Sequence, residues 1–316
     1  MGTFLTLIVM SVILALSNPN FLTYSNIMSV LKQTAFNALV SVGMLLCLIT
    51  AGIDLSVGAN AVFTACLIGA MSRAGLFNGN GYIMMLIAVL AGGLVGFTNG
   101  TLLTRLHLPH PFVSTLGMKN VLWGLALVVT SSQMISNFPD EVEWLGSSTI
   151  NGFPVSFIAV IIIFVLMHIF LTKTAMGRSI YCAGGNLEAT RLSGIDTAKV
   201  LTICYTLSGV MAALAGIVSI GRSGISNGAN AIQPYDTDAI AACIIGGASF
   251  TGGKGTMMGT MIGCLIIAVL RNGFTLLSIP SSWQNIVLGL VIILAVLMDV
   301  IRANMDDKRR RLATVE

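Results

Sequence analysis

The sequence predicts an all-α membrane protein with about ten transmembrane or partly spanning helices, and three observations carry this fold class. Of its 316 residues, 55% are apolar and only 9% are charged. The mean hydropathy is +0.92, and a soluble domain could not bury that much apolar surface. About ten apolar segments approach the roughly 20 residues that a helix needs to cross a bilayer. No long polar region remains, so we expect a single domain over residues 1–316.

The apolar segments define the expected helices in chain order. The first has no basic start and no convincing cleavage site, and further apolar segments follow at once. We therefore expect a first transmembrane helix there instead of a signal sequence. The expected helices lie near residues 2–17, 34–51, 55–72, 82–104, 112–131, 154–172, 200–220, 237–250, 256–273 and 284–303.

Positive charges in the connections predict the orientation, because cytoplasmic connections are richer in Lys and Arg. With the N-terminus in the cytoplasm, eleven of the sixteen Lys and Arg fall on the cytoplasmic side and four on the outer side. Both termini, the tail 304–316 and a polar segment at 173–199 are then cytoplasmic, while the acidic loop 132–153 faces outward. The net charge of +4 follows this asymmetry and does not indicate a nucleic-acid partner.

The cytoplasmic polar segment contains a short sequence, GGNLEATRLSG, that predicts a helix over residues 187–193. Asn186 can cap its first turn, and Gly194 fits a left-handed stop. Glu188 and Arg191 suit its positive and negative ends. A helix of about seven residues is not stable alone in water, so it must pack against something. It is either an ordered loop between two spans or a docking element for a cytoplasmic partner, and we favour docking.

Two similar heptapeptides interrupt pairs of apolar segments. GIDLSVG (52–58) and GASFTGG (247–253) both have glycines at their ends and polar residues at their third and fifth positions. Transporters use small and polar residues in such breaks, where backbone lines a cavity. Two ordinary tight turns would give the same pattern, so both interpretations stay open. The polar residues concerned are Asp54, Ser56, Ser249 and Thr251.

Three polar residues at or within the spans each admit two roles. Asp54 is a carboxylate among apolar stretches, which favours a functional role, but it can also cap the helix that follows, and we favour the cap. Lys119 can extend to the inner surface or line a pathway beside Asn120. Asn99 lies between two nearby glycines, so a hydrogen bond to a neighbouring helix is favoured over contact with a substrate.

No pattern of a metal, cofactor or catalytic site is present in the sequence. The six cysteines form no CxxC pair, and the three histidines have no metal-ligand spacing. GGASFTGGKGT (246–256) resembles a phosphate-binding loop, but Ala248 and Gly255 replace its required glycine and hydroxyl residue. An intramembrane enzyme would need clustered acids or a nucleophile with its base. Uphill transport would therefore need ATP hydrolysis by another polypeptide.

Few acids lie near the spans, which argues against a proton relay. Asp54, Asp238 and Asp299 all lie close to expected membrane interfaces. Asp238, with its neighbour Asp236, starts a short span from the outer side. A neutral, hydroxyl-rich substrate suits this composition better than an ion, which would need fixed counter-charges.

Four stretches, in their order and spacing, resemble one protein family over nearly the whole chain. They are GIDLSVG (52–58), NGTLLTRLHLPHPFVSTLGM (99–118), GGNLEATRLSGI (184–195) and DAIAACIIGGASFTGGKGT (238–256). Together they resemble the permease subunit of bacterial ATP-binding-cassette importers for monosaccharides, the ribose, galactoside and xylose group. The resemblance implies a transport subunit without catalytic activity of its own.

The resemblance also implies partners and a location. A homodimer or heterodimer of permeases would lie in the bacterial inner membrane, with cytoplasmic ATPases and a periplasmic or lipid-anchored binding protein that delivers the sugar. The helix at 187–193 would be the coupling helix that inserts into the ATPase. The residues assigned to coupling are Gly184, Gly185, Asn186, Leu187, Glu188, Ala189, Arg191, Leu192 and Gly194. The candidate pathway or gating residues are Asp54, Ser56, Asn99, Thr115, Lys119, Asn120, Trp123, Asp238, Ser249 and Thr251.

The chain departs from the family at three of these positions, which leaves the substrate open. Many members of this group carry a small hydroxyl or apolar pair at the position of Lys119 and Asn120, and arginine at the position of Trp123. The same group includes permeases for autoinducer-2, and more distant relatives carry nucleosides. A secondary transporter working alone is a further alternative, but it should show coupling charges inside its spans.

Overall fold

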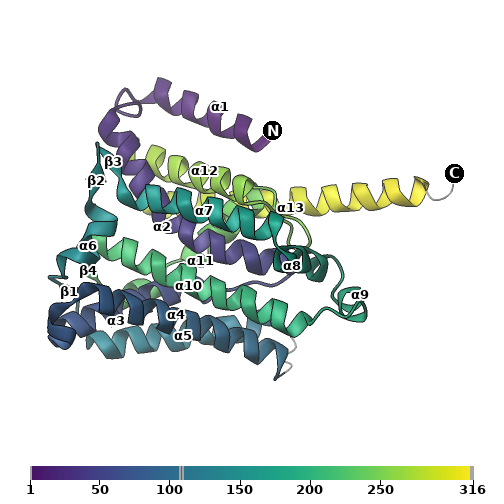
Figure 1. The fold of residues 1–316 in the computed structure, drawn as a ribbon. Coiled ribbons are helices and arrows are strands. Elements are labelled where there is room, and N and C mark those ends of the chain that lie inside the picture. The colour runs from purple at the N-terminus through teal and green to yellow at the C-terminus, as the bar shows by residue number, and fades with distance from the viewer. Residues whose placement is uncertain (1, 107, 109, 314–316) are drawn as a thin grey trace.

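The computed structural model describes residues 2–106, 108 and 110–313 and consists mainly of long helices that lie side by side (Figure 1). Every segment expected to be an apolar helix is helical. These helices are α1 (Gly2–Ser17), α2 (Tyr24–Ile49), α3 (Val57–Arg73), α4 (Gly81–Thr104), α5 (Pro111–Thr130), α7 (Val155–Lys173), α10 (Thr197–Ser223), α11 (Tyr235–Ile245), α12 (Met257–Leu276) and α13 (Ser281–Ala313). The expected tail at 304–316 is helical as far as Ala313, and its last three residues lie outside the described part of the chain.

Among the described helices, six are long and apolar enough to cross a membrane: α2, α4, α5, α7, α10 and α12. Helices α1, α3 and the first part of α13, up to Leu294, are apolar but shorter. The predicted class, an all-α protein that crosses the membrane several times, is therefore confirmed. Ten spans remain a prediction.

Three helix boundaries differ clearly from the sequence prediction, and one of them is the end of α13 at Ala313, ten residues beyond the expected end near residue 303. Helix α2 begins at Tyr24, about ten residues before the expected start near residue 34. Thr23 caps it by accepting a hydrogen bond from the backbone N–H of Asn26, and the polar residues of its first turns hid these turns from a search for apolar segments. Helix α11 ends at Ile245, because the chain turns through a left-handed backbone at Gly247 (φ 94°).

Helices α2 and α10 form the centre of the bundle. The most apolar part of α2 is 89% buried and that of α10 is 67% buried, against 22% for α5. Helices α4 and α10 approach closely at glycines, because a Cβ at Gly96 would overlap the carbonyl oxygen of Tyr205 and one at Gly209 would overlap that of Gly92. Small residues allow two helix backbones to meet in this way.

The bundle has two distinct ends (Figure 1). At one, the α6 end, α6 (Asp140–Ser147) lies with the 3-10 turns η1 (Leu76–Gly79) and η2 (Gly228–Ile232). Two antiparallel strand pairs also lie there, β1 (Ile135–Ser136) with β4 (Ile225–Ser226) and β2 (Thr149–Ile150) with β3 (Phe153–Pro154). At the other, the α9 end, lie α8 (Ala175–Gly185) and α9 (Leu187–Leu192), and α13 extends beyond it.

Candidate functional site

A buried polar cluster forms where the chain breaks between α2 and α3. Asp54 is only 1% exposed. Its Oδ1 accepts hydrogen bonds from the backbone N–H of Ser56 (3.0 Å) and from Ser56 Oγ (2.6 Å), and its Oδ2 accepts one from Ser208 Oγ of α10 (2.7 Å). Asn99 Nδ2 of α4 donates to Ser56 Oγ (2.9 Å). These four residues are called the Asp54 cluster below, and the sequence did not point to Ser208.

The predicted cap at Asp54 takes a different form in the structure. Helix α3 starts at Val57, and Ser56 at its N-cap position makes no side-chain capping bond. Asp54 instead bonds the N–H two residues ahead of it, which fixes the turn that leads into the helix. Asn99 bonds a neighbouring element and not its own helix, as the favoured interpretation expects.

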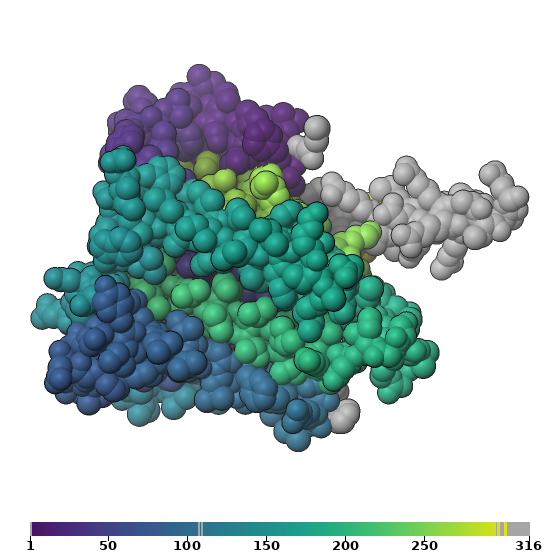
Figure 2. All heavy atoms as spheres, viewed as in Figure 1, coloured from purple at the N-terminus to yellow at the C-terminus, as the bar shows by residue number. Residues whose placement is uncertain are grey.

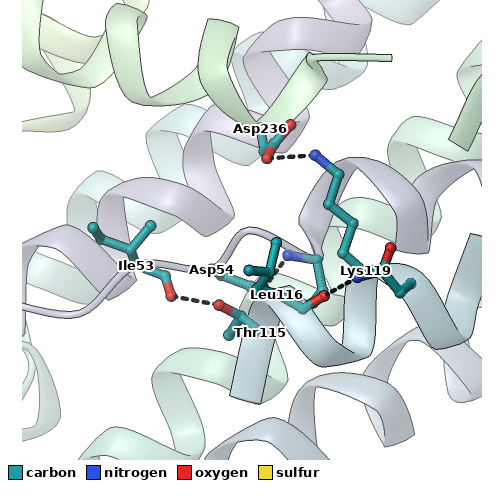
Figure 3. Close-up of polar contacts among 8 residues, drawn as sticks. Ile53, Asp54, Thr115, Leu116, Lys119 and Asp236 are labelled. Atoms are coloured by element: carbon teal, nitrogen blue, oxygen red, sulfur yellow. Dashed lines mark hydrogen bonds and ion pairs between the residues drawn. The ribbon is translucent and has the colours of Figure 1, made fainter. Parts of the chain in front are cut away.

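The carbonyl group of Ile53, next to Asp54, anchors the same break to two further helices. Thr115 Oγ1 of α5 donates to Ile53 O (3.2 Å), as Figure 3 shows. The hydroxyl of Tyr205 on α10 lies 3.5 Å from the same oxygen. Thr115 is fully buried. The break is thus held by α4, α5 and α10, so a shift of one of these helices must disturb it.

Two ion pairs fix the first turn of α11. Lys119 Nζ of α5 lies 2.9 Å from Asp236 Oδ2 (Figure 3), and the two side chains are 21% and 6% exposed. Arg271 Nη2 of α12 contacts both carboxylate oxygens of Asp238, at 2.8 and 2.6 Å. Lys119 therefore neither extends to a surface nor stands unpaired in a pathway. Its partner is 117 residues away in sequence, so sequence spacing could not reveal the pair.

Lys119→Met is expected to lower the free energy of unfolding by about 2 kcal/mol, because it leaves the buried Asp236 carboxylate without its counter-charge. Asp236 Oδ1 already has no partner among the described residues, so little else can compensate. Adding Asp236→Asn should recover most of the loss. Thermal unfolding of the wild type, both single variants and the double variant in detergent measures this coupling, and strictly additive losses would contradict it.

The other candidate pathway residues on α5 do not join the Asp54 cluster. Asn120 is exposed, and its Nδ2 donates to the carbonyl of Leu116 on its own helix (3.1 Å). Trp123 is half-buried, and its indole N–H has no partner in the described structure.

The second break, between α11 and α12, lies against the first. Ser249 Oγ and Thr251 Oγ1 are 2.9 Å apart and stabilise a tight turn. The backbone N–H of Gly253 donates to Ile49 O, the last residue of α2 (2.8 Å). The two heptapeptides have different conformations, because Gly253 has a positive φ whereas the matching Gly58 is helical. Their sequence similarity is therefore not a repeat of local structure.

Helix α9 forms as its sequence predicts, one residue shorter. The side chain of Asn186 accepts a hydrogen bond from the backbone N–H of Ala189 (2.9 Å). Gly194 has φ +84°, and the N–H groups of Gly194 and Ile195 bond the carbonyls of Arg191 and Thr190. This is the pattern of a helix that ends on a left-handed glycine.

The outer surface of α9 is open, whereas its base is packed. Leu187 and Leu192 are 47% and 78% exposed, and Glu188 and Arg191 form an exposed ion pair of 2.8 Å. Helix α9 and its flanking turns lie at the surface of the α9 end (Figure 2). In the described chain, Thr190 is the buried residue of this helix.

Helix α8 joins α9 to the two breaks. Gly184 is buried, and a Cβ there would overlap the carbonyl oxygen of Ile49. Tyr181 OH donates to Gly255 O in the second break (2.7 Å). Burial raises the pKa of the Tyr181 phenol, so it stays a hydrogen-bond donor at neutral pH. The predicted coupling residues thus divide into one buried contact, Gly184, and an exposed group at 185–189, 191, 192 and 194.

Comparison with known proteins places this arrangement in a family. A model of the permease component of branched-chain amino acid transport systems matches residues 26–296. The chain belongs to this permease family. No solved structure matches the permease. The predicted resemblance to sugar-importer permeases is confirmed by the relatives that follow.

Three relatives cover nearly all of the permease. A ribose import permease of Bacillus subtilis (strain 168) is 37% identical over 95% of this chain and 92% of the relative. A D-allose transport system permease of Escherichia coli (strain K12) is 36% identical over 94% and 90%. A galactose/methyl galactoside import permease of Haemophilus influenzae is 32% identical over 95% and 93%. This permease is therefore a multi-pass membrane protein of the sugar-importing family, whose members are transport subunits.

Proposed function

We propose that this permease forms the translocation pathway of an ATP-binding-cassette importer for a monosaccharide of the ribose, galactose or xylose type. A periplasmic or lipid-anchored binding protein delivers the sugar, and a separate cytoplasmic ATPase drives transport. The three relatives are named for ribose, allose and galactose import. The observation that carries the proposal is α9, a capped helix with an exposed apolar and charged surface and no described partner on that side.

Helix α9 has the properties of a docking element. Six residues are too few for a helix that is stable by itself, yet both ends are capped and its base is packed through α8. The two exposed leucines, Leu187 and Leu192, offer apolar area to a groove in the ATPase, and Glu188 and Arg191 flank them. In this proposal the α9 end is cytoplasmic and the chain lies in the bacterial inner membrane as one domain with both termini inside.

A mechanical connection runs from α9 to the membrane-embedded part of the chain. A push on α9 reaches α8, whose Gly184 and Tyr181 contact the two breaks. The first break carries the Asp54 cluster, which holds α4 and α10. We propose that this connection converts closure of the ATPase into alternating access, in which packed helices move between two states.

The exposed face of α5 is an argument for a second permease subunit that packs against it. This helix is the least buried of the six long ones, and Asn120 on it is exposed between Gly117 and Gly124. A Cβ at either glycine would meet no atom within 4 Å. Because a polar side chain is unfavourable in lipid, we assign this face, with Asn120 and Trp123, to the pathway at the interface of a homodimer or heterodimer.

Glu188→Lys is expected to abolish co-purification with the ATPase and sugar uptake, while insertion into the membrane stays normal. The change breaks the pair with Arg191 and places two positive charges on the docking surface. Lys199→Glu is the matched control, since it reverses a charge that is also exposed but lies outside α9. Uptake in cells and affinity purification of the complex measure both effects.

Gly194→Pro should act like Glu188→Lys, because proline cannot adopt φ +84° and has no N–H for the carbonyl of Arg191. Undiminished uptake in both variants would refute the docking role of α9. Uptake by the purified permease alone in liposomes would instead favour a secondary transporter. Competition of uptake by autoinducer-2 or by nucleosides would favour the alternative substrates.

A further inference from the structure

A polar cavity lies at the α6 end of the bundle, between α2, α11, α12 and the start of α13. Its volume is about 130 Å³. Arg222 lies at the edge of the cavity. Because Arg222 is in the last turn of α10, three residues before β4, the cavity lies at the α6 end. Four side-chain amides line it, together with the Asp238–Arg271 ion pair. The amides belong to Gln33, Asn37, Gln233 and Asn285.

The amides have hydrogen-bonding capacity that the described protein does not use. Asn37 is only 8% exposed, yet its side chain bonds no described residue. The other three amides likewise bond no described side chain or backbone group. Arg271, which also lines the cavity, has its Nε buried without a partner in the described chain. Because buried polar groups are nearly always hydrogen-bonded, Asn37 and Arg271 Nε are suited to a polar molecule inside the cavity. Gln33 is half-buried, and Gln233 and Asn285 are exposed, so these three amides can add contacts at its rim.

The chemistry of the walls indicates a neutral molecule that is rich in hydroxyl groups. Each amide both donates and accepts, and each hydroxyl does the same, so amides and hydroxyls pair in either direction. Asp238 and Arg271 neutralise each other, since Arg271 Nη2 occupies both carboxylate oxygens. The rings of Phe36 and Tyr235, 4.8 Å apart at 66°, add an aromatic wall for the C–H face of a sugar ring.

A zwitterionic amino acid suits the cavity less well. Its ammonium group would need a carboxylate whose charge is not already compensated, and Asp238 is paired with Arg271. Its carboxylate could reach Arg222, which is exposed at the edge. The ammonium group would then face neutral amides without a counter-charge.

We propose that this cavity is a monosaccharide-binding site at the outer mouth of the permease, where sugar released by the binding protein is first held and selected. The inference rests on the proposed function, because it assigns the α6 end to the outer side and a sugar to the pathway. It adds selection of the sugar by the membrane subunit itself, with Asn37 as its central buried contact.

The test is calorimetric titration of the purified permease in nanodiscs with D-ribose, D-allose, D-galactose and L-leucine. We expect saturable binding of at least one sugar and at least a tenfold rise in its Kd in Asn37→Ala. Gln33 is half-buried, and Gln33→Ala should raise the Kd as well. This variant replaces Asn37→Ala in the test if Asn37→Ala is unstable. Gln133→Ala is the matched control, since Gln133 is an exposed glutamine in the loop that leads to β1, outside the cavity.

The results separate this proposal from the proposed function. Glu188→Lys should lose uptake but keep the wild-type Kd for sugar, because α9 lies at the other end of the bundle. In the assembled importer, Asn37→Ala should raise the KM for uptake tenfold or more while ATPase association is unchanged. Absence of sugar binding, an unchanged Kd in both cavity variants, or preferential binding of leucine would overturn the site even if ATPase coupling holds.

Discussion

Gly184→Ala is expected to prevent α8 from packing against α2 and thereby to abolish both the stable fold and sugar uptake. A single methyl group at this position would overlap the carbonyl oxygen of Ile49 and lie 2.7 Å from the backbone N–H of Gly253. Both neighbours are backbone atoms, so no side chain can rotate away. Forcing an extra carbon into such a packed site costs about 3 kcal/mol or more.

Gly185→Ala is the matched control for this prediction. Gly185 follows directly in the same helix, is exposed, and a Cβ there would meet no atom within 4 Å. The exchange should be neutral or slightly stabilising, because alanine favours helix more than glycine does. Thermal unfolding of both variants in detergent, with the amount of folded protein in the membrane, tests the contrast. Equal stability of the two variants would show that α8 and α2 do not depend on this contact.

The helices could be predicted from the sequence because apolarity and capping are local properties. Asn186 and Gly194 limit α9 by bonds that span only a few residues, so the short stretch 186–194 contains the whole signal. The start of α2 was missed for a related reason. Its first turns carry Asn26, Lys32 and Gln33, and helix α2 is held there by Thr23 and by tertiary contacts such as Lys32 Nζ to Ser147 O (3.3 Å).

The candidate site could be predicted only in part, because its bonds join distant segments. Asp54 and Ser56 stood out as polar residues in an apolar region, but Ser208 is 154 residues away from Asp54 and is one of many serines. The partner of Lys119 was hidden in the same way. Asn37 lies within an apolar helix and became notable only when the fold placed it beside Gln233 and Asn285. Side-chain type indicates that a residue needs a partner, while the fold decides which partner it has.

Asp54→Ala is expected to destabilise the permease by about 4 kcal/mol, because it removes the acceptor of three buried hydrogen bonds at once. The hydroxyls of Ser56 and Ser208 and the N–H of Ser56 would lose their partner. Each buried group left unsatisfied costs about 1–3 kcal/mol. Asn99, which donates to Ser56 Oγ, would lose its fixed position as well. Thermal unfolding in nanodiscs and uptake in cells should both show a severe loss, whereas Asp140→Ala, at an exposed acid of α6, should be nearly neutral.

Asp54→Asn separates the hydrogen bonds of this residue from its charge. The amide has the same shape and keeps one oxygen acceptor for Ser56, and the Ser208 hydroxyl can rotate to accept from the new NH2 group. If Asp54 acts by holding the break, this variant should keep most of the stability and of the uptake that alanine removes. A folded but inactive Asp54→Asn permease would contradict that role, because it would mean that the carboxylate itself takes part in gating. The contrast matters because Asp54 lies between the α8 contact and helices α4 and α10, on the connection proposed to carry motion from α9.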